Sequence, residues 1–338
     1  MQFNKNLMNV QERIELMVKA GEHLKADTEE WQEIKQQAFY KNGWFTPEFI
    51  QHSANQIADN FLTKNALQKW VAHYHIDDNI QPKNVGIVMA GNIPMVGFHD
   101  MLAVFISGHY QTIKLSGKDD VLLKYLVKYL YSHDVEIQNH IMFADMLKGC
   151  DAYIATGGNS AAKSFEEYFG KYPNIIRKNR TSVAVLTGNE TPEELKKLSD
   201  DIHLYFGLGC RNVTKIYVPK EYDFVPLLKS FEVYKYFADH HKYKNNYDYN
   251  LSIILLNHVY YMTNEATLLV ENEGLFSPIS QLFYEYYEDV NLIVKNLQHN
   301  KDVQCIVGNE HVPFGAAQNP DLFTYADGED TMAFMLGL

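Results

Sequence analysis

A single cysteine lies in a glycine-containing turn, in the stretch LYFGLGCRNVTKIYVP that covers residues 204–219. Cys210 follows the segment GLG and precedes Arg211. Turns expose the side chains that they carry, and a nearby cation or a close backbone approach at glycine lowers a thiol pKa from about 8.5 towards the physiological range. Cys210 is therefore a candidate nucleophile, and the alternative is a buried, inert cysteine beside a loop.

Three other glycine-containing segments follow short apolar runs. They are MAGNIPM at 89–95, IKLSGKD at 113–119 and ATGGNSAA at 155–162. None matches G-x-G-x-x-G or a Walker motif, but each stands where a buried strand is expected to end and to present backbone N–H groups. The segment TGGN opens a predicted helix, which suits an anionic phosphate through exposed donors and the helix dipole. The alternative is that Gly157 and Gly158 make only a tight turn.

The elements that must position these segments follow from the hydrophobic periodicity. Apolar residues at three- and four-residue spacing predict helices in the first part of the chain, where Thr46 and Pro47 form a typical helix start. Beyond Pro82, strand and helix patterns alternate three times, which predicts a parallel sheet whose loops form a ligand crevice. The predicted helices are 10–25, 28–42, 46–62, 63–76, 96–108, 119–133 and 160–172, and the predicted strands are 84–91, 110–116 and 150–158.

A second α/β segment follows, in which the predicted helix 191–206 leads to the cysteine turn and the predicted strand 214–219 leaves it. The other predicted strands are 182–188, 251–257, 266–270 and 303–308, and the tail 312–335 is rich in loops. We expect an α/β fold in three parts. These are N-terminal helices with a nucleotide-binding domain (1–180), a domain that carries the cysteine (181–312) and a tail that packs back on the first domain (313–338).

Composition excludes several classes of function. A length of 338 residues suits two domains, and a net charge of −12 argues against a nucleic-acid partner. No apolar run approaches a membrane span and the first residues lack the apolar core of a signal peptide, so a cytoplasmic protein is expected. Cys150, Cys210 and Cys305 are far apart, and the histidines of 73–78 and 239–244 lack ligand spacing, so neither disulfides nor a metal site is expected.

Four of these motifs resemble, in their order and spacing, those of the aldehyde dehydrogenase superfamily. Within that superfamily the chain is most similar to the LuxC-type acyl-CoA reductases, through GLGCRNVTKIYVP, KNGWFTPE and VPFGAAQNP. The four motifs are Asn92-Ile93-Pro94, Lys114-Leu115-Ser116, Thr156-Gly157-Gly158 and Gly207-Leu208-Gly209-Cys210. The resemblance implies an aldehyde dehydrogenase-like fold, with a nucleotide-binding half and a catalytic-cysteine half.

The same resemblance implies a reaction, in which Cys210 attacks a fatty acyl thioester and a reduced nicotinamide converts the thioacyl-enzyme to an aldehyde. The Asn92 amide and the Cys210 backbone N–H would hold the oxyanion. The remaining roles concern the cofactor: Lys114 and Ser116 would meet the adenosine ribose, Gly157 and Gly158 the pyrophosphate, and Glu271 or Glu273 the nicotinamide ribose. Lys118 adds a second cation after the strand, so NADPH is the expected cofactor, with Asp119 and Asp120 beginning the next helix and pointing away.

The sequence also departs from the family, and other readings stay open. The stretch IIRKNRTSVAVL at 175–186 has no carboxylate where aldehyde-oxidising relatives keep a glutamate, which favours reduction over oxidation. The alternatives are an acyl-phosphate reductase, a cysteine-dependent acyltransferase or thioesterase without cofactor, and a subunit that has lost its chemistry. The expected partners are an acyl-CoA or acyl-carrier substrate, an acyl-transfer protein and further copies of the chain.

Overall fold

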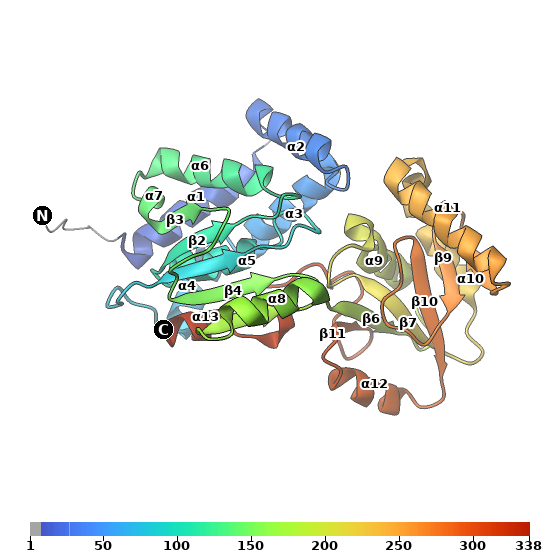
Figure 1. Cartoon of the computed structure of the whole chain (residues 1–338). Coiled ribbons are helices and arrows are strands. Elements are labelled where there is room, and N and C mark those ends of the chain that lie inside the picture. The colour runs from blue at the N-terminus through green and yellow to red at the C-terminus, as the bar shows by residue number, and fades with distance from the viewer. Residues whose placement is uncertain (1–7, 27) are drawn as a thin grey trace, which may run out of the picture. The chain divides into compact units, whose positions relative to one another are not determined.

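The computed structural model describes residues 8–26 and 28–338, and the chain folds into two compact units (Figure 1). Unit 1 comprises the described residues up to Lys178 together with Asp321–Leu338, and unit 2 comprises Asn179–Pro320. The sequence predicts boundaries after residues 180 and 312, whereas the compact units divide after Lys178 and Pro320.

A five-stranded parallel sheet forms the centre of unit 1, with the order β3-β2-β1-β4-β5. The three strands predicted in this part are confirmed, whereas β3 and β5 were not predicted, because three or four residues are too few for a period-2 pattern. The strands are β1 (Asn84–Val88), β2 (Tyr110–Lys114), β3 (Ile141–Phe143), β4 (Ala152–Thr156) and β5 (Asn174–Arg177).

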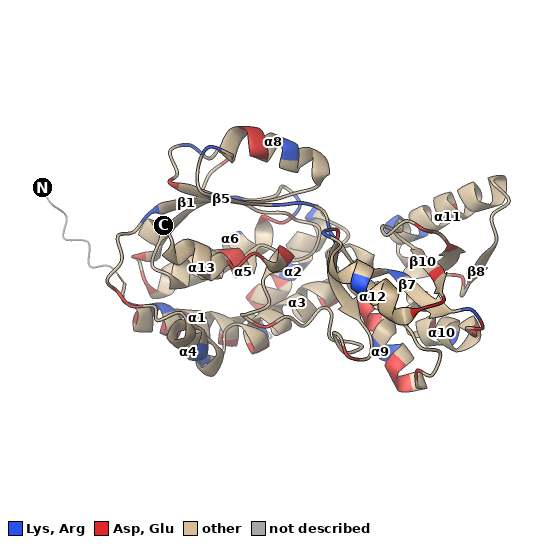
Figure 2. Cartoon of the chain, turned by 90° about the horizontal axis from the view of Figure 1, so that it is seen from below, with Lys and Arg blue, Asp and Glu red and all other residues tan. Residues whose placement is uncertain are grey.

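Helices cover both faces of this sheet. Figure 2 shows α8 on one side of the strands, and α5, α13 and α1 on the other. The predicted helices of this part are confirmed, and the threonine at 46 is the N-cap that accepts a hydrogen bond from the backbone N–H of Phe49. The helices are α1 (Val10–Lys25), α2 (Glu29–Lys41), α3 (Pro47–Asn60), α4 (Lys64–His73), α5 (Phe98–Ile106), α6 (Val121–His133), α7 (Ile137–His140), α8 (Asn159–Phe169) and α13 (Thr331–Leu336).

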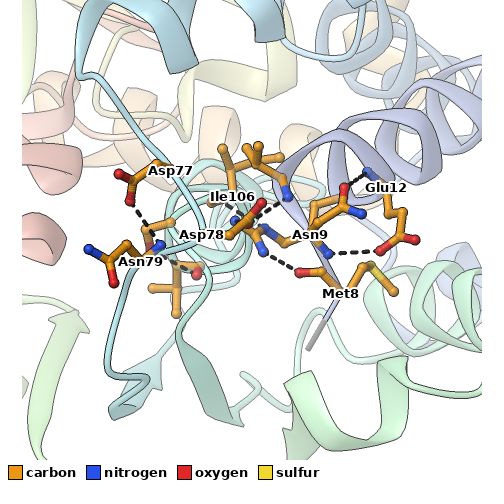
Figure 3. A network of polar contacts seen from close by, with 11 residues as sticks. Met8, Asn9, Glu12, Asp77, Asp78, Asn79 and Ile106 are labelled. Atoms are coloured by element: carbon orange, nitrogen blue, oxygen red, sulfur yellow. Dashed lines mark hydrogen bonds and ion pairs between the residues drawn. The ribbon is translucent and has the colours of Figure 1, made fainter. Parts of the chain in front are cut away.

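Arg13 fixes the loop that leads into β1. Its buried guanidinium donates to the carbonyl of Ile106 over 3.2 Å and to that of Met8, and it lies 3.4 Å from the Asp78 carboxylate. The same carboxylate accepts from the backbone N–H of Val10 over 2.8 Å (Figure 3). This network joins α1, the end of α5 and the loop before β1 at the amino edge of the sheet.

The C-terminal segment is held in unit 1 by a buried ion pair. Arg177, at the end of β5, donates to the Asp100 carboxylate of α5 over 2.5 Å and to the Thr331 hydroxyl over 2.8 Å. Arg177 and Asp100 are both buried, and so is Thr331 at the start of α13. The pair itself joins β5 to α5, and the Thr331 hydroxyl, which contacts both partners, attaches the last helix of the chain to them. A buried charge that loses its partner is strongly destabilising, so the pair is important for the stability of unit 1.

Unit 2 is built on a six-stranded sheet with the order β11-β6-β7-β10-β9-β8, in which only the β8–β9 pair is antiparallel. Its strands are β6 (Thr181–Val185), β7 (Val213–Pro219), β8 (Tyr261–Thr263), β9 (Leu268–Glu271), β10 (Gln281–Tyr287) and β11 (Val303–Val307). Its helices are α9 (Pro192–His203), α10 (Phe224–Ser230), α11 (His241–Leu256) and α12 (Val290–Gln298), with 3-10 turns η1 (Leu204–Gly207) and η2 (Phe231–Asp239). A third 3-10 turn, η3 (Ala326–Gly328), belongs to unit 1.

One predicted strand of unit 2 is wrong. Residues 251–257 form the end of helix α11 and no strand. The helix begins upstream, where Tyr243, Tyr247, Asn250 and Ile254 are buried at helical spacing. A short apolar run fits a strand and a helix end equally well, and here several of its residues are exposed, with Leu256 at 76%.

The remaining elements of unit 2 divide into confirmed and unpredicted ones. The predicted strands at 182–188, 214–219, 266–270 and 303–308 correspond to β6, β7, β9 and β11, and helix 191–206 corresponds to α9. Strands β8 and β10 were not predicted, since β8 has only three residues and the aromatic run of β10 has no clear alternation. The tail is rich in loops as expected, except for α13 near its end.

We predict that Asp100→Ala lowers the free energy of unfolding of unit 1 by about 3–5 kcal/mol, because it leaves the Arg177 guanidinium buried without its carboxylate. Urea unfolding followed by tryptophan fluorescence measures this effect, since Trp31, Trp44 and Trp70 all lie in unit 1. The control Thr331→Val removes a neutral hydrogen-bond partner of the same guanidinium. It should lower the free energy of unfolding by only about 1 kcal/mol. Equal losses in the two variants would contradict a special role of the ion pair.

Candidate functional site

The carboxyl edge of the unit 1 sheet gathers five of the predicted site residues. Lys114 is the last residue of β2 and Ser116 follows it, Asn92 lies four residues beyond the end of β1, and Gly157 and Gly158 follow β4 directly. Strand β1 lies between β2 and β4, so the chain changes direction across the sheet at this point. Open α/β sheets bind ligands at such a switch point, outside the carboxyl ends of the strands.

The turn that carries Asn92 is held by buried contacts. Met95 has a left-handed backbone (φ 55°), and its N–H donates to the Asp119 carboxylate over 2.6 Å. The Ser53 hydroxyl donates to the Pro94 carbonyl over 2.8 Å. Asn92 itself is exposed, and these contacts hold its turn in place at the edge of the sheet.

The loops after β1 and β2 touch each other. A Cβ atom at Gly91 would lie 2.6 Å from the Ser116 hydroxyl oxygen and 3.3 Å from the Cβ of Asp119, so only glycine fits there. Burial, with a smaller effect of Asp120, raises the pKa of Asp119 to about 7. The Asn92 turn and the Lys114–Ser116 strand end therefore form one packed surface.

Two lysines and two aspartates lie near Ser116 in the sequence, and their partners determine which charges are available beside the predicted ribose contact. Lys114 and Lys118 are exposed, and the Lys118 N–H donates to the Ser116 hydroxyl over 3.3 Å. Asp120 occupies the N-cap position of α6 and forms ion pairs with Lys41 and Lys124. Asp119 is buried against Met95 instead of beginning the helix, which corrects the expectation for that residue.

The loop between β4 and α8 has the features of a phosphate-binding turn. The Gly157 N–H donates to the Arg177 carbonyl over 3.2 Å, and a Cβ there would come within 3.0 Å of Ala161 and Phe165. Gly158 is the N-cap of α8, and a Cβ there would meet nothing within 4 Å. The N-terminus of an eleven-residue helix thus stands beside open space, which fits the pyrophosphate of a dinucleotide.

In unit 2, Cys210 lies in a turn between η1 and β7, as the sequence predicts, and η1 directly before this turn is strained. The Cys210 side chain is half-buried. Tyr205 (φ 56°), Phe206 (φ 57°) and Gly207 (φ 73°) are all left-handed, and this conformation costs roughly 1–2 kcal/mol for each residue that has a Cβ. Strain of this kind persists only where the surrounding structure enforces it, and it is concentrated at functional sites.

A hydrogen-bonded chain supports Cys210 from the neighbouring strand. The Ser182 hydroxyl, on β6, donates to the Cys210 carbonyl over 3.1 Å, and the Cys305 thiol lies 3.1 Å from the same hydroxyl. Ser182 and Cys210 are 28 residues apart, so no local sequence pattern indicates this contact.

The other two cysteines are poor nucleophiles. Burial raises the pKa of the Cys150 thiol and that of the Cys305 thiol, which favours the protonated form in both. Arg211, which follows the candidate nucleophile, partly offsets the rise in the pKa of Cys305. Since thiolates and not thiols attack carbonyl carbons, these environments leave Cys210 as the candidate.

The two candidate glutamates occupy different positions in unit 2, and both are exposed. Glu271 is the last residue of β9 and is in register with Tyr284 of β10. Glu273 lies in the following loop, where its carbonyl accepts a hydrogen bond from the buried Lys215 ammonium over 2.8 Å. Lys215 belongs to the start of β7, so the loop at Glu273 is tied to the strand that follows the cysteine turn.

The histidine nearest to Cys210 in sequence has a structural role. His203 is buried at the end of α9, where its ring nitrogens lie 2.8 Å from the Ser199 carbonyl and 2.8 Å from the Thr267 hydroxyl. Burial lowers its pKa to about 4. A histidine bound in this way is not placed to activate a second nucleophile.

The described residues contain neither a cluster of metal-ligating side chains nor a helix that could span a membrane. No cluster of three or more His, Cys, Asp or Glu side chains in the described part of the chain could hold a metal ion. Across residues 8–26 and 28–338, no helix is both long and apolar enough to cross a membrane.

No protein-family model matches the sequence, and no curated protein matches it either. Solved structures do match the fold. Aldehyde dehydrogenase 21 from Physcomitrella patens, solved with the reaction product succinate, has a TM-score of 0.66 at 12% identity, over 90% of this chain and 74% of that one. An NAD-dependent aldehyde dehydrogenase from Sinorhizobium meliloti has a TM-score of 0.64 at 12% identity, over 89% and 70% of the two chains.

A third similar structure contains a nicotinamide cofactor. It is a mutant of the indole-3-acetaldehyde dehydrogenase AldA from P. syringae in complex with NAD⁺ and IAA, with a TM-score of 0.62 at 9% identity, over 88% of this chain and 71% of that one. At such low identity the likeness extends to the fold alone. Together with the two α/β units described above, these matches show that the chain has the aldehyde dehydrogenase fold.

Proposed function

We propose that the protein reduces a fatty acyl thioester to an aldehyde through a thioacyl-enzyme on Cys210, with NADPH as the reductant. The observation that carries this proposal is the half-buried Cys210 thiol in the turn directly after strained η1 of an aldehyde dehydrogenase fold. The LuxC-type motifs of the sequence support an acyl thioester as the substrate class.

Acylation requires the residues of the chain alone. The Cys210 thiolate attacks the thioester carbonyl, a new carbon–sulfur bond forms, and CoA or a carrier thiol leaves with the proton that the Cys210 thiol gave up. The Asn92 amide and the Cys210 N–H donate hydrogen bonds to the oxyanion that develops in this step. In other enzymes, removal of one such donor raises the activation free energy by about 3–4 kcal/mol.

The stretch IIRKNRTSVAVL at 175–186, which includes β6, supports reduction over hydrolysis. It contains no carboxylate, so it offers no general base that would activate a water molecule against the thioacyl-enzyme. Both ring nitrogens of His203 have buried hydrogen-bond partners, Ser199 and Thr267. This counts against a cofactor-free thioesterase or acyltransferase in which His203 is the base. A thioacyl-enzyme that is protected from water is suited to reduction.

The predicted cofactor residues of unit 1 would hold the adenosine half of the dinucleotide, with Gly157 and Gly158 at the N-terminus of α8 on the pyrophosphate and Lys114 and Ser116 on the adenosine ribose. The family resemblance assigns the nicotinamide ribose to Glu271 of unit 2, with Glu273 as the alternative. A bound reduced nicotinamide supplies the hydride that converts the thioester carbon to the aldehyde level. The choice of NADPH is supported by exposed Lys114 and Lys118, and by carboxylates of Asp119 and Asp120 that are engaged elsewhere.

We predict that Cys210→Ala takes up no acyl group from a long-chain acyl-CoA, whereas Cys305→Ala and Cys150→Ala still do, since only Cys210 is the nucleophile. Intact-protein mass spectrometry measures the adduct, and addition of NADPH should release it as aldehyde. Acyl label on Cys210→Ala, or release only as free fatty acid, would refute the reductase.

We predict that Asn92→Ala slows acylation by about 10²- to 10³-fold and leaves the dissociation constant of NADPH nearly unchanged, because the lost donor acts on transition-state charge. Rapid-quench measurement of acyl transfer and NADPH fluorescence give the two quantities. The control Asn79→Ala makes the same change in the loop before β1, at the other edge of the same sheet. It should change neither the acylation rate nor the dissociation constant of NADPH. An unchanged acylation rate with weaker NADPH binding would place Asn92 in the cofactor site.

We predict a ten- to hundredfold preference for NADPH over NADH in kcat/KM, because a charge-assisted contact with the 2′-phosphate contributes about 1.5–3 kcal/mol. Simultaneous Lys114→Ala and Lys118→Ala substitution should abolish the preference. The control Lys83→Ala, at the amino edge of the sheet, should retain it. Preference for NADH in the native protein, or for NADPH in the double variant, would show that the ribose pocket lies elsewhere.

A further inference from the structure

The side chain of Asn212 links both ends of the cysteine turn. Its amide nitrogen lies 3.1 Å from the Asp201 carbonyl, 3.3 Å from the Ile202 carbonyl and 2.9 Å from the Leu204 carbonyl. Its amide oxygen accepts a hydrogen bond from the Gly209 N–H over 2.7 Å. One fully buried side chain therefore connects the end of α9 with the residue directly before Cys210.

The main chain of Asn212 adds to this link. Its N–H donates to the Gly209 carbonyl over 3.1 Å, and its carbonyl accepts from the Ser182 N–H over 3.1 Å. Gly209 is thus bound to Asn212 through both its N–H and its carbonyl. Ser182 binds the turn at two places, since its hydroxyl also donates to the Cys210 carbonyl.

The left-handed residues explain why such a link is needed. At Tyr205 and Phe206 the backbone leaves the helical path of α9, and the carbonyls at the helix end lose their usual partners. The Phe206 ring packs against Phe237 and His240, with ring centroids 4.5 and 4.6 Å away. This packing supplies no hydrogen-bond donor to the main-chain carbonyls at the end of α9. A neutral amide offers two donors to the carbonyls and an acceptor to Gly209 at once, whereas a hydroxyl has a single donor, a carboxylate has none and a hydrocarbon has neither donor nor acceptor.

We propose that Asn212 is the positioning residue of the nucleophile, which holds Gly209 so that the Cys210 thiol and its backbone N–H face the substrate carbonyl in fixed directions. This inference rests on the acyl transfer to Cys210 proposed above. Misplacement of a reacting group by about 1 Å can cost a factor of 10² in rate. We therefore expect Asn212 to govern the rate of acylation and not the affinity for the thioester.

Three variants test the proposal. Asn212→Ala removes all side-chain links, and Asn212→Asp keeps an acceptor for Gly209 but turns a carboxylate towards the three carbonyls. Asn250→Ala is the matched control, because Asn250 is also a buried amide of unit 2, and it donates to the Ile279 carbonyl over 2.8 Å, outside the cysteine turn. Single-turnover acylation at a series of acyl-CoA concentrations separates the limiting rate from the half-saturating concentration.

The three cysteines also report whether a variant is folded. In a folded protein, iodoacetamide should modify half-buried Cys210 at about the native rate, because this small reagent needs no oriented thiol. Cys150 in unit 1 is buried and should stay protected. Cys305 in unit 2 is half-buried like Cys210, but its surroundings raise the pKa of its thiol, so it should react more slowly than Cys210. Peptide mapping after alkylation gives the three rates separately.

The expected result is a 10- to 100-fold lower limiting rate in Asn212→Ala and Asn212→Asp, with a half-saturating concentration within threefold of the native value. Cys150 should stay protected, Cys305 should react no faster than in the native protein, and Asn250→Ala should acylate within threefold of the native rate. The proposal is overturned if Asn212→Ala acylates within threefold of the native rate, if Asn250→Ala is slowed equally, or if Cys305 becomes as reactive as Cys210.

Amide hydrogen exchange separates this proposal from the proposed function. If the native protein takes up no acyl group, the acyl-transfer function fails, but exchange at residues 204–212 still tests the positioning role. Faster exchange there in both Asn212 variants and not in Asn250→Ala supports the role of Asn212 in holding the turn. Unchanged exchange in Asn212→Ala overturns it.

Discussion

The strands of the unit 1 sheet all run parallel, and this constraint places the candidate binding residues of that unit. Parallel strands need crossovers that return the chain to the same starting edge, so every loop that follows a strand emerges at the opposite edge. The turns at Asn92, Ser116 and Gly158 are therefore neighbours although they are far apart in the sequence. Since β1 is central and the chain winds outwards on both sides, the loops of β1 and β4 lie at the switch point of the sheet, where open α/β sheets bind ligands.

Buried polar groups then give these loops their shape. Asp119 binds the N–H of left-handed Met95, Ser182 binds the Cys210 carbonyl, and Lys215 binds the Glu273 carbonyl. In each case a side chain with little access to water satisfies a main-chain group that has no secondary-structure partner. An unpaired buried donor or acceptor costs about 1–3 kcal/mol, so these contacts select one loop conformation from many.

The cysteine turn also depends on a buried side chain that satisfies main-chain groups. Two aromatic residues adopt left-handed backbones there, which an isolated peptide would avoid, and packing with the amide of Asn212 compensates for them. Contacts with α9, β6 and the aromatic residues of η2 thus hold the strained backbone in place. Such an arrangement suits a nucleophile, because a fixed thiol loses little entropy when it attacks.

The sequence by itself determined the alternation of strands and helices, the cysteine turn and the four ordered motifs, because each of these depends on local periodicity or on glycine at a turn. It misjudged residues 251–257, because an apolar run of that length is compatible with strand and helix, and burial on one face of α11 decided the outcome. It also missed β10 and the short strands β3, β5 and β8, which are stable only through their neighbours in a sheet. The roles of Asp119, Ser182 and Asn212 were decided by the tertiary structure alone, since burial and the folded path of the chain give a polar side chain the main-chain group that it must satisfy.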